Sequence, residues 1–169
     1  SSAPFTLDFE GFGKGTTSSL AAPERSAARE RCWTLLGQAE RLADAGDVAA
    51  ALAAAREAAD GIEAAGDPEL RSWARASLAR HLVLRGDAAG ADAMFGELAE
   101  AGPEVAPVAL TAARSFHLAG ELSRASAWYA RAVFGRGGVE EEWIVQAALE
   151  GSVLLSLERG DPDGALSLI

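Results

Sequence analysis

Cysteine and the residues that favour β-strands are both scarce in this sequence. The single cysteine, Cys32, excludes an internal disulfide framework and lacks the neighbouring ligands that a structural zinc site needs. Valine, isoleucine, threonine and tyrosine are few, which argues against a sheet. We therefore expect a fold without a sheet and a protein without a metal or another cofactor.

Clustered positive charge and long apolar runs are also missing. The formal net charge is −10, and no basic cluster is present that could neutralise a row of phosphates. Nucleic acid is therefore not an expected partner. No apolar run approaches a membrane span and no charged-then-apolar leader is visible, so we expect a cytoplasmic protein that does not bind membranes. Because the chain starts Ser1-Ser2 without methionine, a processed terminus or a removed signal stays open.

What the sequence does contain is alanine, leucine, glutamate and arginine, which favour helices, together with a recurring glycine-acid pair. The spacing of the pairs is 40, 34 and 40 residues, a quasi-period typical of helical repeats. An alanine follows five residues after each glycine. The pairs predict an all-α fold of four helical hairpins, the last one incomplete. They are Gly46-Asp47, Gly86-Asp87, Gly120-Glu121 and Gly160-Asp161.

The expected elements are seven to eight helices that follow an N-terminal arm. Pro103 and Pro107 cannot both lie comfortably inside one helix, so an extended piece or a short turn is expected over 103–106. The helix over 68–85 is expected to bury one stripe that includes Leu70, Trp73 and Leu78. We expect a repeat domain over 23–169 with hairpins at about 23–65, 67–101, 103–135 and 139–169. The helices are expected at about 23–45, 48–65, 68–85, 87–101, 107–119, 121–134, 140–159 and from 161 onward.

The arm, residues 1–22, has a different composition. Apolar residues alternate with polar ones as in an extended segment, and a glycine and serine stretch behind them is typical of a flexible tether. We predict that the arm docks on the repeat surface, in cis or on a neighbouring molecule. A natural autoinhibitory segment, a swapped contact and a ligand peptide joined to its receptor all stay open. Its anchors would be Phe5, Leu7, Asp8, Phe9 and Phe12.

Alignment of the chain on the four glycines shows further recurring positions. Small residues stand seven before the glycine, at Ala39, Ala79 and Ala113, and larger ones stand nine after it, at Phe95 and Tyr129. Over residues 24–169 the pattern resembles the tetratricopeptide repeat family. The resemblance implies a right-handed superhelical array of antiparallel hairpins whose first helices line a concave peptide-binding groove.

Two features recur among the residues that the resemblance places in this groove. Arg31-x-Trp33 returns as Arg71-x-Trp73, and Arg80 and Arg114 each stand six residues before a glycine. One interpretation is a groove with aromatic platforms and guanidinium groups that bind carboxylates. The other is that the tryptophans are core residues and the arginines pair with nearby acids. The groove residues would be Trp33, Leu36, Glu40, Trp73, Arg80, Val83, Leu110, Arg114 and His117.

The function that this pattern predicts is a non-catalytic scaffold or adaptor for a short acidic and aromatic peptide or a partner protein. The alternative is a sensory or oligomerisation module cut from a larger regulator. Self-association through the arm or through the incomplete last helix stays open, and an uncovered last helix would favour the alternative.

Four motifs that could suggest chemistry have simpler explanations. The glycine-lysine stretch over 11–16 has an aspartate, Asp8, where a phosphate loop needs its first glycine. His81 and His117 have no second ligand at a convincing spacing. Cys32 has no evident base partner, so a buried thiol is expected. Glu140, Glu141 and Glu142 point in different directions on a helix, so dipole compensation is expected rather than metal binding. We expect no catalytic residues.

Overall fold

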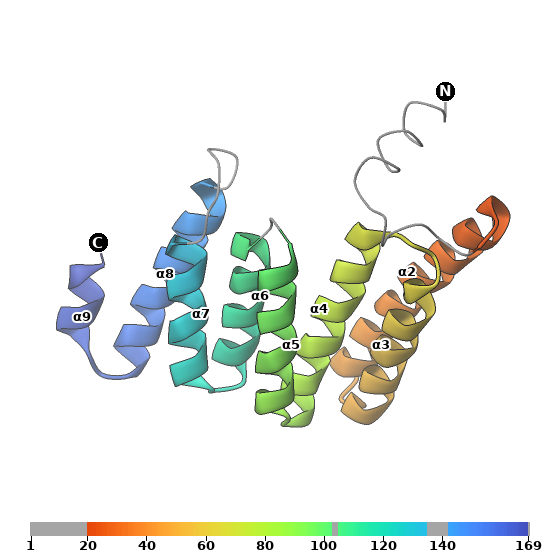
Figure 1. The fold of residues 1–169 in the computed structure, drawn as a ribbon. Coiled ribbons are helices and arrows are strands. Elements are labelled where there is room, and N and C mark those ends of the chain that lie inside the picture. The colour runs from red at the N-terminus through yellow and green to blue at the C-terminus, as the bar shows by residue number, and fades with distance from the viewer. Residues whose placement is uncertain (1–19, 103–104, 135–141, 169) are drawn as a thin grey trace. The chain divides into compact units, whose positions relative to one another are not determined.

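In the computed structural model, the described residues are 20–102, 105–134 and 142–168, and within these ranges the chain is helical and contains no strand (Figure 1). The prediction of an all-α fold is confirmed. The arm anchors and the 11–16 stretch lie outside the described residues. The helices are α2 (Ala22–Asp44), α3 (Val48–Glu63), α4 (Pro68–Arg85), α5 (Ala88–Ala101), α6 (Val105–Leu118), α7 (Leu122–Phe134), α8 (Glu142–Glu158) and α9 (Pro162–Ser167).

The same turn ends four of these helices. Gly46, Gly86, Gly120 and Gly160 all have positive φ, which only glycine adopts without strain. Each glycine N–H donates to the carbonyl three residues earlier, and the next N–H donates to the carbonyl four residues before the glycine. This pair of bonds is the Schellman motif, and it satisfies carbonyls that the helix end leaves open. The four glycines therefore hold structurally equivalent positions, as their spacing predicted.

The aspartate after three of these glycines caps the next helix. Asp47 accepts a hydrogen bond from the Ala50 amide at 3.1 Å, and Asp161 accepts one from the Gly164 amide at 2.8 Å. Asp87 does the same for Gly90 at 2.9 Å. Such N-caps replace helical bonds that the first turn cannot make. Helix end and helix start are thus fixed within two neighbouring residues.

The start of α6 differs from the prediction. Val105 and Ala106 are helical, so the extended piece predicted over 103–106 is wrong for these two residues, while 103 and 104 lie outside the described part. Pro107 is the third residue of α6. The first-turn amides have no partner within the helix, so proline costs little there.

The described helices belong to two compact units, and the boundary between Ser77 and Leu78 lies inside α4. The first unit contains α2, α3 and the part of α4 up to Ser77. Its buried residues are mostly alanines, which let α2 and α3 approach closely. The buried side chains of α2 and α3 are Cys32, Leu35, Leu36, Ala39, Ala51, Ala54, Ala55, Ala58, Ala59 and Ile62.

The second unit, from Leu78, has an aromatic core. Phe95 on α5 is fully buried and packs edge-to-face against Phe116 on α6 at 5.9 Å and against Trp128 on α7 at 6.0 Å between ring centroids. Gly151 on α8 lies so close to Tyr129 that an added Cβ would be 2.4 Å from its ring. The second unit therefore joins four helices through large side chains.

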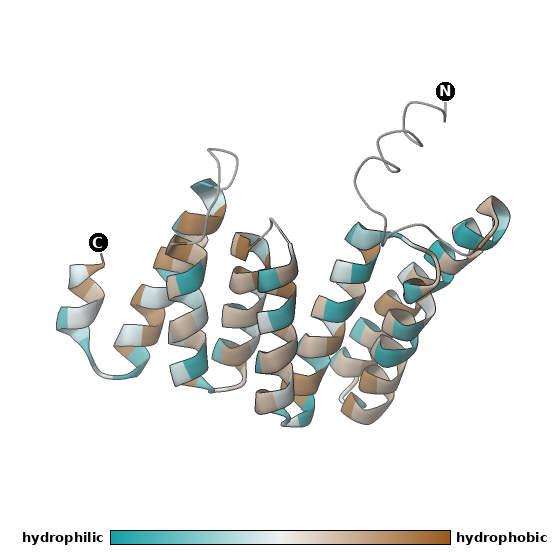
Figure 2. Ribbon diagram, in the orientation of Figure 1, coloured by the Kyte–Doolittle hydropathy of each residue, from teal (hydrophilic) through white to brown (hydrophobic). Residues whose placement is uncertain are grey.

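Apolar and polar residues are interleaved along each helix (Figure 2). No helix within residues 20–102, 105–134 and 142–168 is long and apolar enough to cross a membrane. The buried faces are narrow stripes, and several large apolar residues of α8 and α9 lie outside them. Exposed examples are Trp143, Leu154, Leu157, Leu166 and Leu168.

Candidate functional site

Both tryptophans of the first unit are exposed. Trp33 on α2 has an exposed fraction of 56%, and Trp73 on α4 has one of 59%. The prediction that Trp73 belongs to the buried stripe of its helix is wrong, although Leu70 and Ala74 beside it are buried. The interpretation of these tryptophans as core residues is therefore excluded.

The arginine two residues before each tryptophan pairs with a glutamate on α3. Arg31 bonds to Glu57, and Arg71 Nε lies 2.9 Å from Glu63. Residues two apart on a helix point in directions about 200° apart, so each tryptophan points away from the side that its arginine shares with α3. The sides of α2 and of Pro68–Ser77 that carry Trp33 and Trp73 are called the tryptophan face below.

An ion pair joins the two halves of the tryptophan face. Arg29 Nε lies 3.0 Å from Asp67, which also accepts a hydrogen bond from the Leu70 amide at 3.0 Å and so caps α4. Arg29 stands one turn before Trp33 on the same side of α2. The pair is partly exposed and contributes about 1 kcal/mol or less to stability, but it places the start of α4 beside the face of α2.

Small residues follow the tryptophans on this face. Gly37 stands one helical turn after Trp33, and Ser77 stands one turn after Trp73. Beside Gly37 the Arg41 guanidinium is near, with Nη1 3.4 Å from where a Cβ on Gly37 would stand. Each exposed ring can serve as a flat apolar contact surface for a side chain from another molecule.

The other residues predicted for the groove are divided between surface and core. Leu36, Val83 and Leu110 are buried, so their side chains are unavailable to a partner. Glu40 is half-buried. In the second unit Arg80 is half-buried, and burial lowers the pKa of its guanidinium.

Arg114 and His117 lie on α6 in the second unit. Arg114 is exposed and makes no hydrogen bond or ion pair with another described residue. His117 Nδ1 lies 3.0 Å from the Tyr129 hydroxyl, and Nε2 lies 3.0 Å from Glu158 Oε2. The neutral tautomer with its hydrogen on Nε2 satisfies both contacts, because the hydroxyl then donates to Nδ1 and Nε2–H donates to the carboxylate.

Electrostatics argue against a reactive tyrosine in this cluster. Burial raises the pKa of Tyr129, the Arg114 charge opposes that rise, and the Glu158 charge adds to it. The hydroxyl therefore keeps its proton and donates to His117, which joins α7 to α6, and His117 in turn joins α6 to Glu158 on α8. The sequence analysis named Tyr129 only as a large residue nine after its turn glycine, and it did not name Glu158. Alignment of the chain on the turn glycines could have suggested the contact between His117 and Glu158. His117 stands three residues before Gly120 and Glu158 two before Gly160, so both lie in the last turn of their helices.

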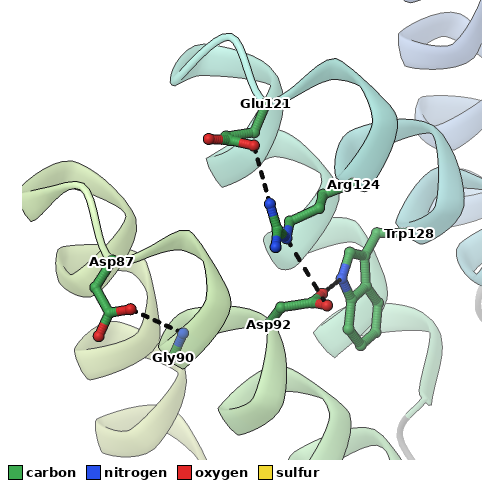
Figure 3. Close-up of polar contacts among 6 residues, drawn as sticks. All are labelled: Asp87, Gly90, Asp92, Glu121, Arg124 and Trp128. Carbon is green, nitrogen blue, oxygen red and sulfur yellow. Dashed lines mark hydrogen bonds and ion pairs between the residues drawn. The ribbon is translucent and has the colours of Figure 1, made fainter.

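A second polar cluster surrounds Trp128 on α7 (Figure 3). The indole N–H donates to Asp92 Oδ1 on α5 at 2.6 Å, and Arg124 lies 3.9 Å from the other Asp92 oxygen. Arg124 also donates to Glu121 at 3.1 Å, and the Arg131 guanidinium lies 4.3 Å from the centroid of the Trp128 ring. The bond to Asp92 satisfies the indole N–H of the buried Trp128. Together with the contact between Arg124 and Asp92, it connects α5 to α7.

The remaining candidate motifs show no chemistry. Cys32 is buried, as predicted, and burial together with the Asp67 charge raises the pKa of its thiol, which disfavours the reactive thiolate. His81 is fully buried. No group of three or more histidine, cysteine, aspartate or glutamate side chains among the described residues could hold a metal ion. Glu140 and Glu141 lie outside the described residues, and Glu142 is the first residue of α8.

The first unit has two shallow depressions, and Glu30, one turn before Trp33 on α2, lines one of them. Both are lined by Arg31 and Glu57, the ion pair between α2 and α3. Their remaining walls come from α3 in one case and from α2 in the other. Neither tryptophan lines these two depressions. Comparison with known proteins gives no match, whether with family models, curated sequences or solved structures.

Proposed function

We propose that this chain is a non-catalytic scaffold that binds a short peptide or a partner protein on the tryptophan face. The observation that carries the proposal is the exposure of Trp33 and Trp73 at corresponding places of α2 and α4. Tryptophan is the residue type most enriched among energetically dominant contacts of protein interfaces. The ion pairs of Arg31 and Arg71 with α3 support it, because they orient both helices with the indoles outward.

The proposed architecture is an array of antiparallel helix hairpins that resembles tetratricopeptide repeats and winds into a right-handed superhelix. The four equivalent Schellman turns support it. The buried alanine five residues after each turn glycine supports it as well. These alanines are Ala51, Ala91, Ala125 and Ala165. We place such a scaffold in the cytoplasm.

The proposed ligand class is a peptide with aromatic or aliphatic anchors and acidic residues. The anchors would lie on the indoles of the first unit. Arg114, in the second unit, is a separate candidate contact for an acidic group, because it is exposed and forms no hydrogen bond or ion pair with a described residue. The N-terminal arm has this composition, with Phe5 and Phe9 beside Asp8 and Glu10, and is itself a candidate occupant.

The test uses a synthetic peptide of residues 1–15 and a chain that begins at Ser18. A second peptide replaces Asp8 by Asn and Glu10 by Gln, so that it reports the aromatic contribution alone. The double substitution Trp33→Ala and Trp73→Ala should weaken binding of the neutral peptide at least about tenfold in calorimetry, since it removes both anchors. Trp143→Ala, which removes an equally exposed tryptophan of the second unit, is the matched control.

Equal affinity of the double tryptophan variant and the parent chain for the neutral peptide would exclude the tryptophan face as the binding surface. Arg114→Glu should weaken binding of the acidic peptide only. An equal loss for both peptides would show that Arg114 does not bind their carboxylates.

A second candidate function is an oligomerisation or sensory module of a larger regulator. Exposed leucines on α8 and α9 favour it, because isolated apolar side chains are normal on a surface but several close together suggest a contact. Light scattering across a concentration series tests it. A mass that rises with concentration, and that returns to the monomer value in Leu154→Ser with Leu157→Ser, would support this candidate. A constant monomer mass would exclude it.

A further inference from the structure

The charges around the tryptophan face differ from those around Arg114. Glu30 stands one turn before Trp33 on α2, and Glu69 stands one turn before Trp73 on α4. Both glutamates are exposed, and neither carboxylate forms a hydrogen bond or an ion pair with any residue that the structure describes. Each exposed indole is therefore accompanied by an uncompensated negative charge on its own helix.

The nearby arginines do not cancel these charges. Arg29 pairs with Asp67, and Arg31 and Arg71 pair with glutamates on α3. Each of those arginines already compensates another acid. Arg41 lies on the same side of α2, where its Nη1 would be 3.4 Å from a Cβ on Gly37, but the exposed carboxylate of Asp44, one turn further on, offsets its charge. The negative excess of the tryptophan face therefore comes from Glu30 and Glu69.

Helix geometry brings each indole toward its glutamate. Side chains on an α-helix lean toward the N-terminus, so a long side chain covers the turn that precedes it. For Trp33 and Trp73 that turn carries Glu30 and Glu69 respectively. A cation on the face of either indole would therefore also be within reach of a carboxylate.

A cation–π contact between an arginine and a tryptophan is already present in the second unit. The Arg131 guanidinium lies 4.3 Å from the centroid of the Trp128 ring, within the range of a cation–π contact. Trp33 and Trp73 have no such partner among the described residues and remain exposed. Their ring faces are free to accept a cation from another molecule.

We infer that the tryptophan face binds a basic segment of its partner, with one arginine or lysine on each indole held by Glu30 or Glu69. The inference rests on the proposed function, because it takes the tryptophan face as the binding surface. It differs in the charge of the bound residues, which are basic here and not acidic. The net charge of −10 adds to it, since a negative protein attracts a basic partner over long range.

The experiment compares three peptides on the chain that begins at Ser18. They are the peptide of residues 1–15, its neutral version with Asp8→Asn and Glu10→Gln, and a basic version with Asp8→Arg and Glu10→Arg. The basic peptide should bind at least about tenfold more tightly than the acidic one at low salt, and raised salt should narrow the difference. Calorimetry at two salt concentrations measures both effects.

Substitutions in the chain then show which residues cause the preference for the basic peptide. Glu30→Gln with Glu69→Gln should remove most of the advantage of the basic peptide and leave the affinity for the neutral peptide unchanged. Asp60→Asn with Asp163→Asn removes the same net charge from exposed positions away from the indoles and is the matched control. An equal loss in this control would reduce the inference to a general charge effect and overturn it.

The outcomes separate this inference from the proposed function. Tighter binding of the acidic peptide, still lost in the Trp33→Ala with Trp73→Ala variant, would overturn the inference and leave the proposed function standing. Insensitivity of all three peptides to the tryptophan substitutions would overturn both.

Discussion

In the first unit the buried side chains are mostly alanine and both tryptophans are exposed, whereas the second unit packs two phenylalanines, a tryptophan and a tyrosine into its core. The difference appears at equivalent places, because Ala55, Phe95 and Tyr129 all stand nine residues after a turn glycine. Alanine at this place brings helices close and leaves no room for a ring. The two aromatic residues that the structure describes in the first unit, Trp33 and Trp73, are therefore on the surface, where a partner can contact them.

The buried and the exposed tryptophans also differ in their polar partners. The indole N–H of Trp128 donates to Asp92, so its burial leaves no donor without a partner. Trp33 and Trp73 are open to water on a large part of their surface. The first unit is thus suited to recognition and the second to structural stability, and substitutions at matched positions can test that division.

The largest expected effect comes from Phe95→Ala. Its ring is fully buried between Phe116 and Trp128, so truncation should destabilise the protein by about 3–5 kcal/mol through lost burial and a residual cavity. Chemical denaturation followed by circular dichroism measures the free energy of unfolding. Trp33→Ala should change it by only about 0.5 kcal/mol. A similar cost for both substitutions would contradict the division between the units.

Alanine substitution of two glycines inside helices should change stability in opposite directions. Gly151→Ala should destabilise by about 1–3 kcal/mol, because the new methyl group would displace the Tyr129 ring and its hydrogen bond to His117. Gly61→Ala in α3 should stabilise by about 0.4–1 kcal/mol, since no heavy atom lies within 4 Å of the new Cβ and alanine favours the helix. Thermal denaturation of the two variants measures both shifts. Stabilisation by Gly151→Ala would show that α7 and α8 are less tightly packed than described.

The polar contact of the buried tryptophan should matter less than its packing. Asp92→Ala leaves the Trp128 indole N–H without its acceptor and should cost about 1–3 kcal/mol. Asp92→Asn keeps an acceptor oxygen and should cost less. Asp47→Ala, which removes an N-cap in the first unit, should cost about 1 kcal/mol. Urea denaturation can rank the three, and an equal cost for Asp92→Asn and Asp92→Ala would contradict the role of the acceptor.

The smallest effect concerns pH. The pKa of Tyr129 is raised, so the folded state holds the hydroxyl proton more tightly than the unfolded state, whose pKa is about 10. The resulting stabilisation is complete below pH about 10 and is lost as the pH rises through the folded-state pKa. Tyr129 is the only tyrosine, so tyrosinate absorbance reports it alone. Tyr129→Phe should remove this pH dependence, and a native titration at or below the ordinary value would contradict the prediction.

Local signals made most of the fold predictable. A glycine followed by an acid determines both a helix end and the next N-cap, and each depends only on nearby backbone groups. The start of α6 was missed because proline was treated as a helix breaker, whereas Pro107 occupies the first turn. The exposure of Trp73 was not predicted. The spacing of apolar residues shows which side of a helix faces its neighbours, but not whether the neighbouring helices leave room for an indole.

The candidate site was less predictable than the fold. The repeated Arg-x-Trp pair identified both tryptophans, but their orientation depends on glutamates in α3 that no local pattern connects to them. Leu36, Val83 and Leu110 were assigned to the groove although they are buried, because an offset of one position on a helix rotates a side chain by about 100°. The contact of His117 with Tyr129 and Glu158 joins three helices and depends on tertiary packing.

The boundary between the two units lies inside α4, between Ser77 and Leu78, and not in a loop. Proteases cleave extended backbone, so limited digestion at this boundary requires that α4 first unwind. A fragment that ends at Ser77 or begins at Leu78 would lose the backbone hydrogen bonds that cross the boundary. Either unit expressed alone should therefore include the whole of Pro68–Arg85, which makes this helix the indispensable shared segment of any dissected version of the protein.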